Sequence, residues 1–187
     1  MKADQIMAMQ RKLRVKVDGV WGPVSIAACR AHLEGLMKPY PYPGTSEREL
    51  LEFYGPAGDQ RRLDWLHVED LGIIFEGEQV RIVRVHERLA DSLYSILVEL
   101  KERFPHVVRQ YAGVYMNRPM RGGTRPSLHA RGAAIDLMPA TNGNLAPWPL
   151  KADMPLEVME IFARRGWLAA GAFWGRDAMH FQATRPR

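Results

Sequence analysis

The sequence predicts an α+β fold, in which a small antiparallel sheet is flanked by helices and a short helical module comes first. Stretches with helical spacing of apolar residues alternate with short strand-like runs, and a proline-rich stretch follows the first 38 residues. The length of 187 residues fits one domain with a small addition, at roughly 150 residues per domain. With 47% hydrophobic and 25% charged residues, the composition excludes a disordered or fibrous chain.

The first 38 residues predict two short helices. The first helix follows Asp4, a residue that can cap it, and carries apolar residues three and four positions apart: Ile6, Met9 and Leu13. After a turn at Asp18-Gly19, Pro23 suits the first turn of the second helix. Its apolar face comprises Ile26, Cys29, Leu33 and Leu36. Three prolines within 38–44 are typical of an extended linker, so we expect a module at 1–38, a linker at 39–45 and a main domain at 46–187.

The main domain mixes helices and strands. Ser46 and Glu49 form a capping box for a short helix through Phe53. Two strands, at 72–75 and 80–85, are expected to form a hairpin around residues 76–79. Helical spacing predicts a long helix over 89–104, stopped by Pro105, and a second helix from Pro155 that ends near Gly166. Further strands are expected at 107–116, 133–138 and 178–182.

Several classes of protein are excluded by what the chain lacks. A single cysteine, Cys29, rules out an intramolecular disulfide framework and a four-cysteine zinc site, so metal ligands must be mainly His, Asp or Glu. No run of about 18 apolar residues is present, and we expect no membrane span. The N-terminal residues do not have the pattern of a secretory signal, so we expect synthesis in the cytoplasm without a signal peptide.

The formal net charge of +5 is unevenly distributed. Seven of the 26 Lys and Arg residues, but only three of the 21 Asp and Glu residues, lie in 1–38. This excess favours an anionic partner for the N-terminal module. No basic–aromatic stripe or recognition motif stands out, so we do not expect nucleic-acid binding.

Two polar stretches carry the residues best suited to chemistry. His129, Asp136 and His180 fit a catalytic zinc site, which takes three protein ligands and keeps one position open for water. Asp136 lies in an apolar strand-like run, where an unpaired carboxylate costs several kcal/mol, so it needs a cation. Asp177 lies three residues before His180 and can act as a general base toward the water of such a site.

Other interpretations of these residues remain open at this stage. Asp136 can instead pair with Arg131 or Arg118, and Asp177 can cap a turn. Two His and one carboxylate also suit the Fe(II) of oxygenases. In those enzymes, however, the carboxylate usually lies much closer to the first His than the seven-residue gap between His129 and Asp136.

The pattern Ser127-x-His129-x-x-Gly132-x-Ala134-x-Asp136, followed by Asp177-x-x-His180-Phe181, resembles the signature of the zinc-dependent DD-peptidases. That family contains D-Ala-D-Ala carboxypeptidases, D-Ala-D-Ala dipeptidases and the L-alanyl-D-glutamate endopeptidases of phage endolysins. The resemblance covers roughly residues 80–184. It implies a hedgehog/DD-peptidase-like fold, with zinc held by His129, Asp136 and His180 and with Asp177 as the base. Many relatives have Glu in the base position, and the Asp is more like the endolysin branch.

The resemblance also implies residues that bind the substrate. Ser127 matches the motif serine, a hydrogen-bond donor to the substrate, and an upstream arginine binds and polarises it. Arg118, Arg121 and Arg125 compete for that role, and we choose Arg118, because a guanidinium can hold a carboxylate or an oxyanion by paired donors. Arg121 and Trp174 are further candidates for substrate binding.

The N-terminal segment resembles a shortened peptidoglycan-binding helical module. The resemblance is carried by 10–13, by 17–23 with its Asp-Gly-x-x-Gly turn, and by Ala27-Ala28. The two resemblances together imply a zinc peptidase that cuts the stem peptide of bacterial peptidoglycan at the cell wall, as a phage or prophage endolysin of L-alanyl-D-glutamate or D-Ala-D-Ala type. We also expect a monomer. The alternative is a non-catalytic, wall-binding phage structural protein. Residues 45–80 carry no motif that indicates a function.

Overall fold

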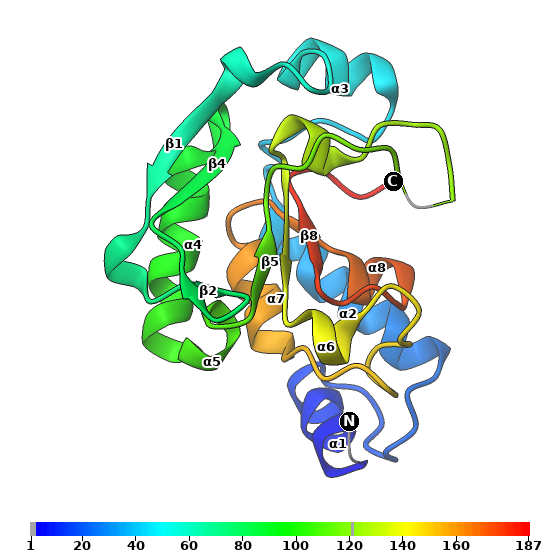
Figure 1. The fold of residues 1–187 in the computed structure, drawn as a ribbon. Helices are drawn as coiled ribbons and strands as arrows, with labels where there is room; N and C mark the ends of the chain where they lie inside the picture. Colours follow the sequence, from blue (N-terminus) through cyan, green and yellow to red (C-terminus); the bar gives the residue numbers. More distant parts are fainter. Residues whose placement is uncertain (1–2, 121) are drawn as a thin grey trace.

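The structure, a computed structural model, describes residues 3–120 and 122–187 and has the predicted α+β architecture (Figure 1). The helices are α1 (Ala3–Lys12), α2 (Pro23–Met37), α3 (Glu47–Tyr54), α4 (Ala90–Arg103), α5 (Pro105–Val108), α6 (Pro139–Asn142), α7 (Leu156–Ala163) and α8 (Ala170–Trp174). The strands are β1 (Leu63–His67), β2 (Ile74–Phe75), β3 (Glu78–Gln79), β4 (Ile82–His86), β5 (Tyr111–Gly113), β6 (Ala134–Leu137), β7 (Leu168–Ala169) and β8 (His180–Gln182). None of the helices in these residues combines the length and hydrophobicity needed to cross a bilayer.

The central sheet has four antiparallel strands in the order β5-β6-β8-β7. Ile135 of β6 pairs with Phe181 of β8, and Asp136 pairs with His180. Because side chains alternate between the two faces of a strand, Ile135 and Phe181 lie on one face and Asp136 and His180 on the other. The first face is fully buried in the core, and the second carries the candidate site.

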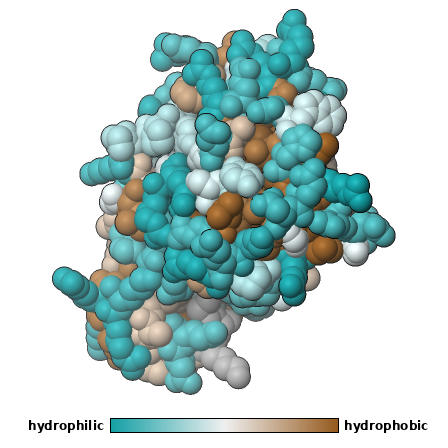
Figure 2. Space-filling view, turned by 90° about the vertical axis from the view of Figure 1, so that its left-hand side faces the viewer, coloured by the Kyte–Doolittle hydropathy of each residue, from teal (hydrophilic) through white to brown (hydrophobic). Residues whose placement is uncertain are grey.

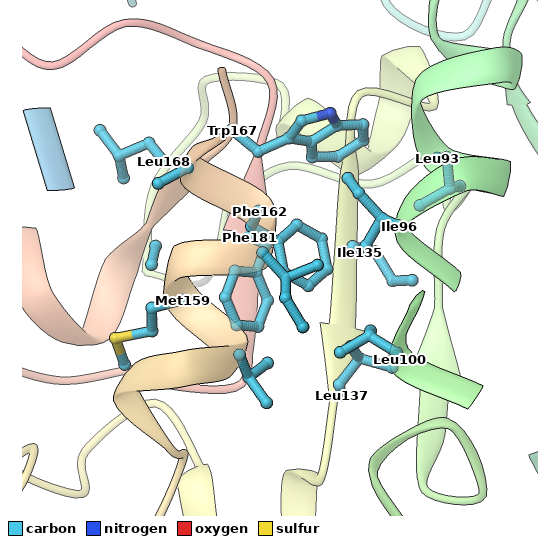
Figure 3. Close-up of a cluster of buried hydrophobic side chains, with 14 of the residues drawn as sticks. Leu93, Ile96, Leu100, Ile135, Leu137, Met159, Phe162, Trp167, Leu168 and Phe181 are labelled. Atoms are coloured by element: carbon cyan, nitrogen blue, oxygen red, sulfur yellow. The ribbon is translucent and has the colours of Figure 1, made fainter. Parts of the chain in front are cut away.

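The core lies between this sheet, α4 and α7. Phe162 of α7 stacks on Phe181, with ring centroids 3.9 Å apart and an interplanar angle of 14°. Figure 3 shows this pair beside Ile135 and Trp167, with leucine and isoleucine side chains of α4 on the other side. Burying a large apolar side chain contributes about 1.5–3 kcal/mol, so this layer strongly favours the register of β6 and β8.

The N-terminal helices pack against the rest of the chain. The buried side chains Cys29, Leu33 and Met37 of α2 belong to the same hydrophobic cluster as the sheet residues. Trp21 meets Trp148 edge to face, with ring centroids 5.3 Å apart. Toward α7, the buried Glu160 side chain accepts from Lys12 Nζ at 2.7 Å and lies 2.8 Å from His32 Nε2. Apolar contact and ion pairing therefore hold this segment in place.

The proline-rich segment also lies against the main domain. Tyr42, Pro43 and Gly44 are buried. The Tyr42 ring meets that of Trp167 edge to face, and its hydroxyl donates to Ser92 Oγ at 3.0 Å. These contacts pack residues 42–44 against the rest of the chain.

Most predicted helices are confirmed. Ser46 caps α3, accepting from the Glu49 amide at 3.3 Å, as the capping box requires. Helices α1, α2, α4 and α7 match the expected stretches, although Asp4 lies within the first turn of α1. The strand expected at 107–116 is mostly not one, because Pro105 begins a further helical turn, α5, before β5 starts at Tyr111.

The predicted hairpin at 72–85 is only partly correct. Its turn exists, with Glu76 and Gly77 at positive φ, but β2 and β3 pair over just two residues each. The following strand, β4, pairs instead with β1, and Trp65 lies opposite Arg84. The sequence pattern missed β1 because three of its five residues are exposed. The face of the molecule that includes β1 and β4 is mainly hydrophilic, with scattered hydrophobic patches (Figure 2).

Candidate metal centre

Two adjacent strands and one loop bring the three predicted metal ligands together. Asp136 and His180 come from paired positions of β6 and β8, and His129 comes from the 3-10 turn at Leu128–Arg131. One ligand atom from each residue lies within 4.8 Å of the other two. All three side chains are largely buried, so the group forms a shielded centre.

The distances between the donor atoms suit a tetrahedral ion. His180 Nδ1 lies 2.9 Å from Asp136 Oδ1, and His129 Nε2 lies 3.2 Å from His180 Nδ1 and 3.3 Å from Asp136 Oδ1. Ligands at about 2.0–2.2 Å from a tetrahedral zinc lie about 3.3–3.6 Å from one another. The observed triangle is close to this size, so small adjustments suffice to hold the ion.

Hydrogen bonds on the far sides of the two imidazole rings set which nitrogen atoms face the centre. His129 Nδ1 lies 2.7 Å from the Val114 carbonyl oxygen, which can only accept, so Nδ1 carries the proton. His180 Nε2 lies 3.2 Å from Gln182 Oε1 and donates to it in the same way. Both remaining nitrogen atoms then present lone pairs to the centre, as metal-ligating histidines do.

The electrostatics of the centre keep the carboxylate ionised. Burial by itself would raise the pKa of Asp136, but hydrogen bonds and charge from His129 and His180 outweigh it and hold this pKa well below its usual value. Burial acts to lower the pKa of His180, whereas Asp136 raises it, and the net pKa is raised. A negative centre that attracts a proton also attracts a divalent cation.

The loop before β6 is built to present His129. Ser127 caps its turn by accepting from the His129 amide at 3.3 Å, and Gly132 ends it in the left-handed conformation, with φ of 63°. A Cβ atom at Gly132 would lie 2.7 Å from the His86 amide nitrogen of β4. The glycine of the motif therefore lets the turn approach β4 closely, where the His86 amide donates to its carbonyl at 3.0 Å.

The three ligands line a cavity of about 410 Å³. The same cavity is lined by most of the other residues expected at the site: Arg118, Arg125, Ser127, Trp174 and Asp177. Trp174 stacks on the His180 ring, with centroids 5.6 Å apart and an interplanar angle of 25°. The charge of Asp177 contributes to the raised pKa of His180, which is consistent with a carboxylate near the centre.

Of two further arginines considered from the sequence, the structure describes Arg131 but not Arg121. Arg131 does not pair with Asp136: it is buried, donates to the Gly55 carbonyl at 3.0 Å and forms an ion pair with Glu47. Arg121 lies outside the described residues. The Ser127 amide donates to the Arg118 carbonyl at 3.1 Å, which places these two residues side by side at the cavity.

Sequence reasoning missed further residues at the site. Gln182 accepts a hydrogen bond from the His180 ring. Its position two residues after His180, on the same face of the strand, could have indicated this contact from the sequence. Arg176 and Asn144 also line the cavity. Asn144 lies in an irregular segment that carries no motif, so only the tertiary structure reveals it. The buried His86 lies outside the lining of this cavity and has a structural role, because its Nε2 contacts the Tyr54 carbonyl oxygen at 3.0 Å.

The fold and the site together form a candidate metal centre: a buried His-Asp-His group at one face of a small antiparallel sheet, with an adjoining cavity. Residues 121–183 match the family model of D-alanyl-D-alanine carboxypeptidase. This match confirms the predicted resemblance to the zinc DD-peptidases and supports a zinc metallopeptidase that acts on peptidoglycan. No curated protein and no solved structure matches the chain.

Proposed function

We propose that the protein is a zinc peptidase that hydrolyses the stem peptide of bacterial peptidoglycan, as a phage or prophage endolysin of L-alanyl-D-glutamate or D-Ala-D-Ala type. The observation that carries this proposal is the His-Asp-His group, because both of its imidazole rings are oriented by partners outside the centre. His129, Asp136 and His180 would hold the zinc ion. When bound, zinc supplies Lewis acidity that activates water and polarises the scissile carbonyl.

The other residues at the cavity have roles that follow from their chemistry. Asp177 accepts a proton from the attacking water and passes it to the departing amine. The Arg118 guanidinium holds a carboxylate or the developing oxyanion by paired donors. Ser127 and Trp174 line the same cavity, where a hydroxyl and an aromatic face orient the peptide. Arg121 is a further candidate for substrate binding.

We also propose that residues 1–38 bind the wall and that the protein acts there as a monomer. Among the basic side chains of this segment that the structure describes, Arg11, Arg14, Lys16 and Lys38 are exposed. Lys12 is paired with Glu157 and Glu160 on α7, and Lys16 with Asp18 of the same segment. Peptidoglycan carries carboxylates on its stem peptides, so an exposed basic surface favours its binding.

Digestion of purified walls tests the proposal. The protein is incubated with walls before and after metal removal by a chelator, and the fragments are identified by mass spectrometry. We expect loss of digestion after metal removal, recovery on adding zinc, and fragments from a single type of peptide bond. Undiminished digestion by fully metal-free protein would contradict the proposal. The fragment masses distinguish a cut after L-alanine from a cut before the terminal D-alanine.

A further inference from the structure

A second cavity, of about 470 Å³, adjoins the candidate active site. The two cavities share four lining residues: Thr45, Trp174, Gln182 and Arg187. Trp174 therefore borders both cavities, and its ring stacks on that of His180. A substrate that occupies the first cavity can extend into the second without leaving the protein surface.

The second cavity is basic and is completed by the N-terminal segment. Its charged lining consists of Arg30 and Glu34 from α2 and of Arg185 and Arg187 from the C-terminal segment. Arg185 forms an ion pair with Glu49. Within the described residues, neither Arg30 nor Arg187 has an ion-pair partner, so their charge is available to a ligand.

Arg30 is held in position by the backbone of α8. Its Nε donates to the Ala172 carbonyl at 3.2 Å, and its Nη2 donates to the Phe173 carbonyl at 2.7 Å. A guanidinium has five N–H donors, so three of them remain for water or a ligand. Figure 1 shows α2 beside α8, which carries Trp174 at its end. These bonds orient a cation next to the wall that the two cavities share.

We propose that this second cavity is a substrate subsite that binds a carboxylate group of the peptide, and that Arg30 of α2 is its principal cation. A preoriented guanidinium binds a carboxylate by charge-assisted, paired hydrogen bonds. The nearby Glu34 carboxylate opposes this binding and limits its strength. The N-terminal segment thus forms part of the substrate-binding site, in addition to any contact it makes with the wall. This inference rests on the proposed peptidase function.

The test compares peptides that differ by one charge. A synthetic stem pentapeptide that contains both candidate bonds, L-Ala-γ-D-Glu-L-Lys-D-Ala-D-Ala, is measured beside versions amidated at the glutamate or at the C-terminus. Binding to the zinc-loaded protein of residues 1–187 is measured by calorimetry, and kcat and KM are measured where hydrolysis occurs. We expect one of the two amidated peptides, the one without the carboxylate that the second cavity binds, to bind the wild type at least about ten-fold more weakly than the unmodified peptide. In the Arg30→Gln protein, the same amidation should have little effect.

Two further variants separate charge from packing. Glu34→Gln removes an opposing charge and should tighten binding of the carboxylate peptide, a gain that a loosened structure does not produce. Arg109→Gln, at an exposed site outside both cavities, should behave as the wild type. If Arg30→Gln weakens the binding of all three peptides equally, or weakens the binding of none, the proposed subsite is wrong. If the wild type cleaves no peptide, the peptidase function fails, and the calorimetric comparison still decides whether the cavity recognises a carboxylate.

Discussion

Asp136 and His180 lie directly opposite each other on the antiparallel strands β6 and β8, with Asp136 Oδ1 2.9 Å from His180 Nδ1. Paired residues on one face have Cβ atoms about 4.5–5.5 Å apart, so the sheet itself sets the separation of these two candidate ligands. The neighbouring pair, Ile135 and Phe181, is buried in the core and keeps this register. A slip by one residue would turn both ligands away from the site.

Replacing Asp177 by Asn should lower kcat about 10²–10⁴-fold, because a carboxamide cannot accept the proton that general-base catalysis requires. Asp177 has φ of 58°, and Asn tolerates this left-handed conformation as well as Asp does, so the backbone should not change. Rates on a stem peptide and zinc content measured on the same sample check this. The exposed Glu102→Gln is the control. A wild-type rate in the Asp177→Asn protein would remove the residue from the mechanism.

Replacing Gln182 by Leu should weaken metal binding about 10–100-fold, because the His180 ring loses the acceptor that orients it. Competition with a chromogenic chelator measures the affinity. Gln182→Glu, which keeps an acceptor oxygen at this position, should retain metal better than the leucine variant. Equal metal affinity in the two variants would show that the hydrogen bond at His180 Nε2 does not affect metal binding.

Gly132→Ala should destabilise the protein, because alanine is strained at the positive φ of this position, a cost of about 1–3 kcal/mol. The loss should exceed this figure, because the added Cβ also meets the β4 backbone at 2.7 Å. Gly35 of α2 provides a control of opposite sign. A Cβ there meets nothing within 4 Å, so Gly35→Ala should stabilise by about 0.5–1 kcal/mol. Thermal or urea unfolding measures both changes. An unaltered unfolding midpoint for Gly132→Ala would contradict the packing described for the motif.

Neutralising the exposed basic residues Arg11, Arg14 and Lys16 to Gln should reduce binding to purified walls, with the largest difference at low salt, where charges are least screened. Cosedimentation at two salt concentrations measures this. The matched control neutralises three exposed basic residues elsewhere, Arg81, Arg109 and Lys151. If both triple variants bind equally, residues 1–38 have no special part in wall binding.

The Cys29 thiol should be inert in the folded protein. Burial, assisted by the charge of Glu160, raises the pKa of Cys29 to about 12, and only the thiolate reacts with alkylating agents. In the unfolded chain this thiol ionises at a lower pH, so the native state binds more protons and stability falls as the pH rises above about 9 toward 12. Iodoacetamide at pH 8, with and without urea, provides the check. Rapid modification without urea would contradict this burial.

The sequence predicted elements best where their signals are local. The capping box at Ser46, the amphipathic spacing of α4 and α7, and the turn at 76–77 all depend on nearby residues, and all are present. Strand pairing was predicted less well, because β1 lies outside the motifs and is largely exposed. Arg84 of β4, which pairs with Trp65 of β1, has its Cζ atom 4.9 Å from the ring centroids of both Trp65 and Tyr115. No local sequence pattern indicates these long-range contacts.

By itself, the sequence determined the fold class, the motif residues and the exclusion of a four-cysteine metal site, because composition and spacing suffice for these. The tertiary structure decided that Asp136 meets two histidines rather than Arg131, since pairing across strands depends on sheet register. It also decided that Gln182 orients His180 and that α2 lines a cavity beside the site. Those relationships join segments far apart in the chain, and only the packing of the core brings them together.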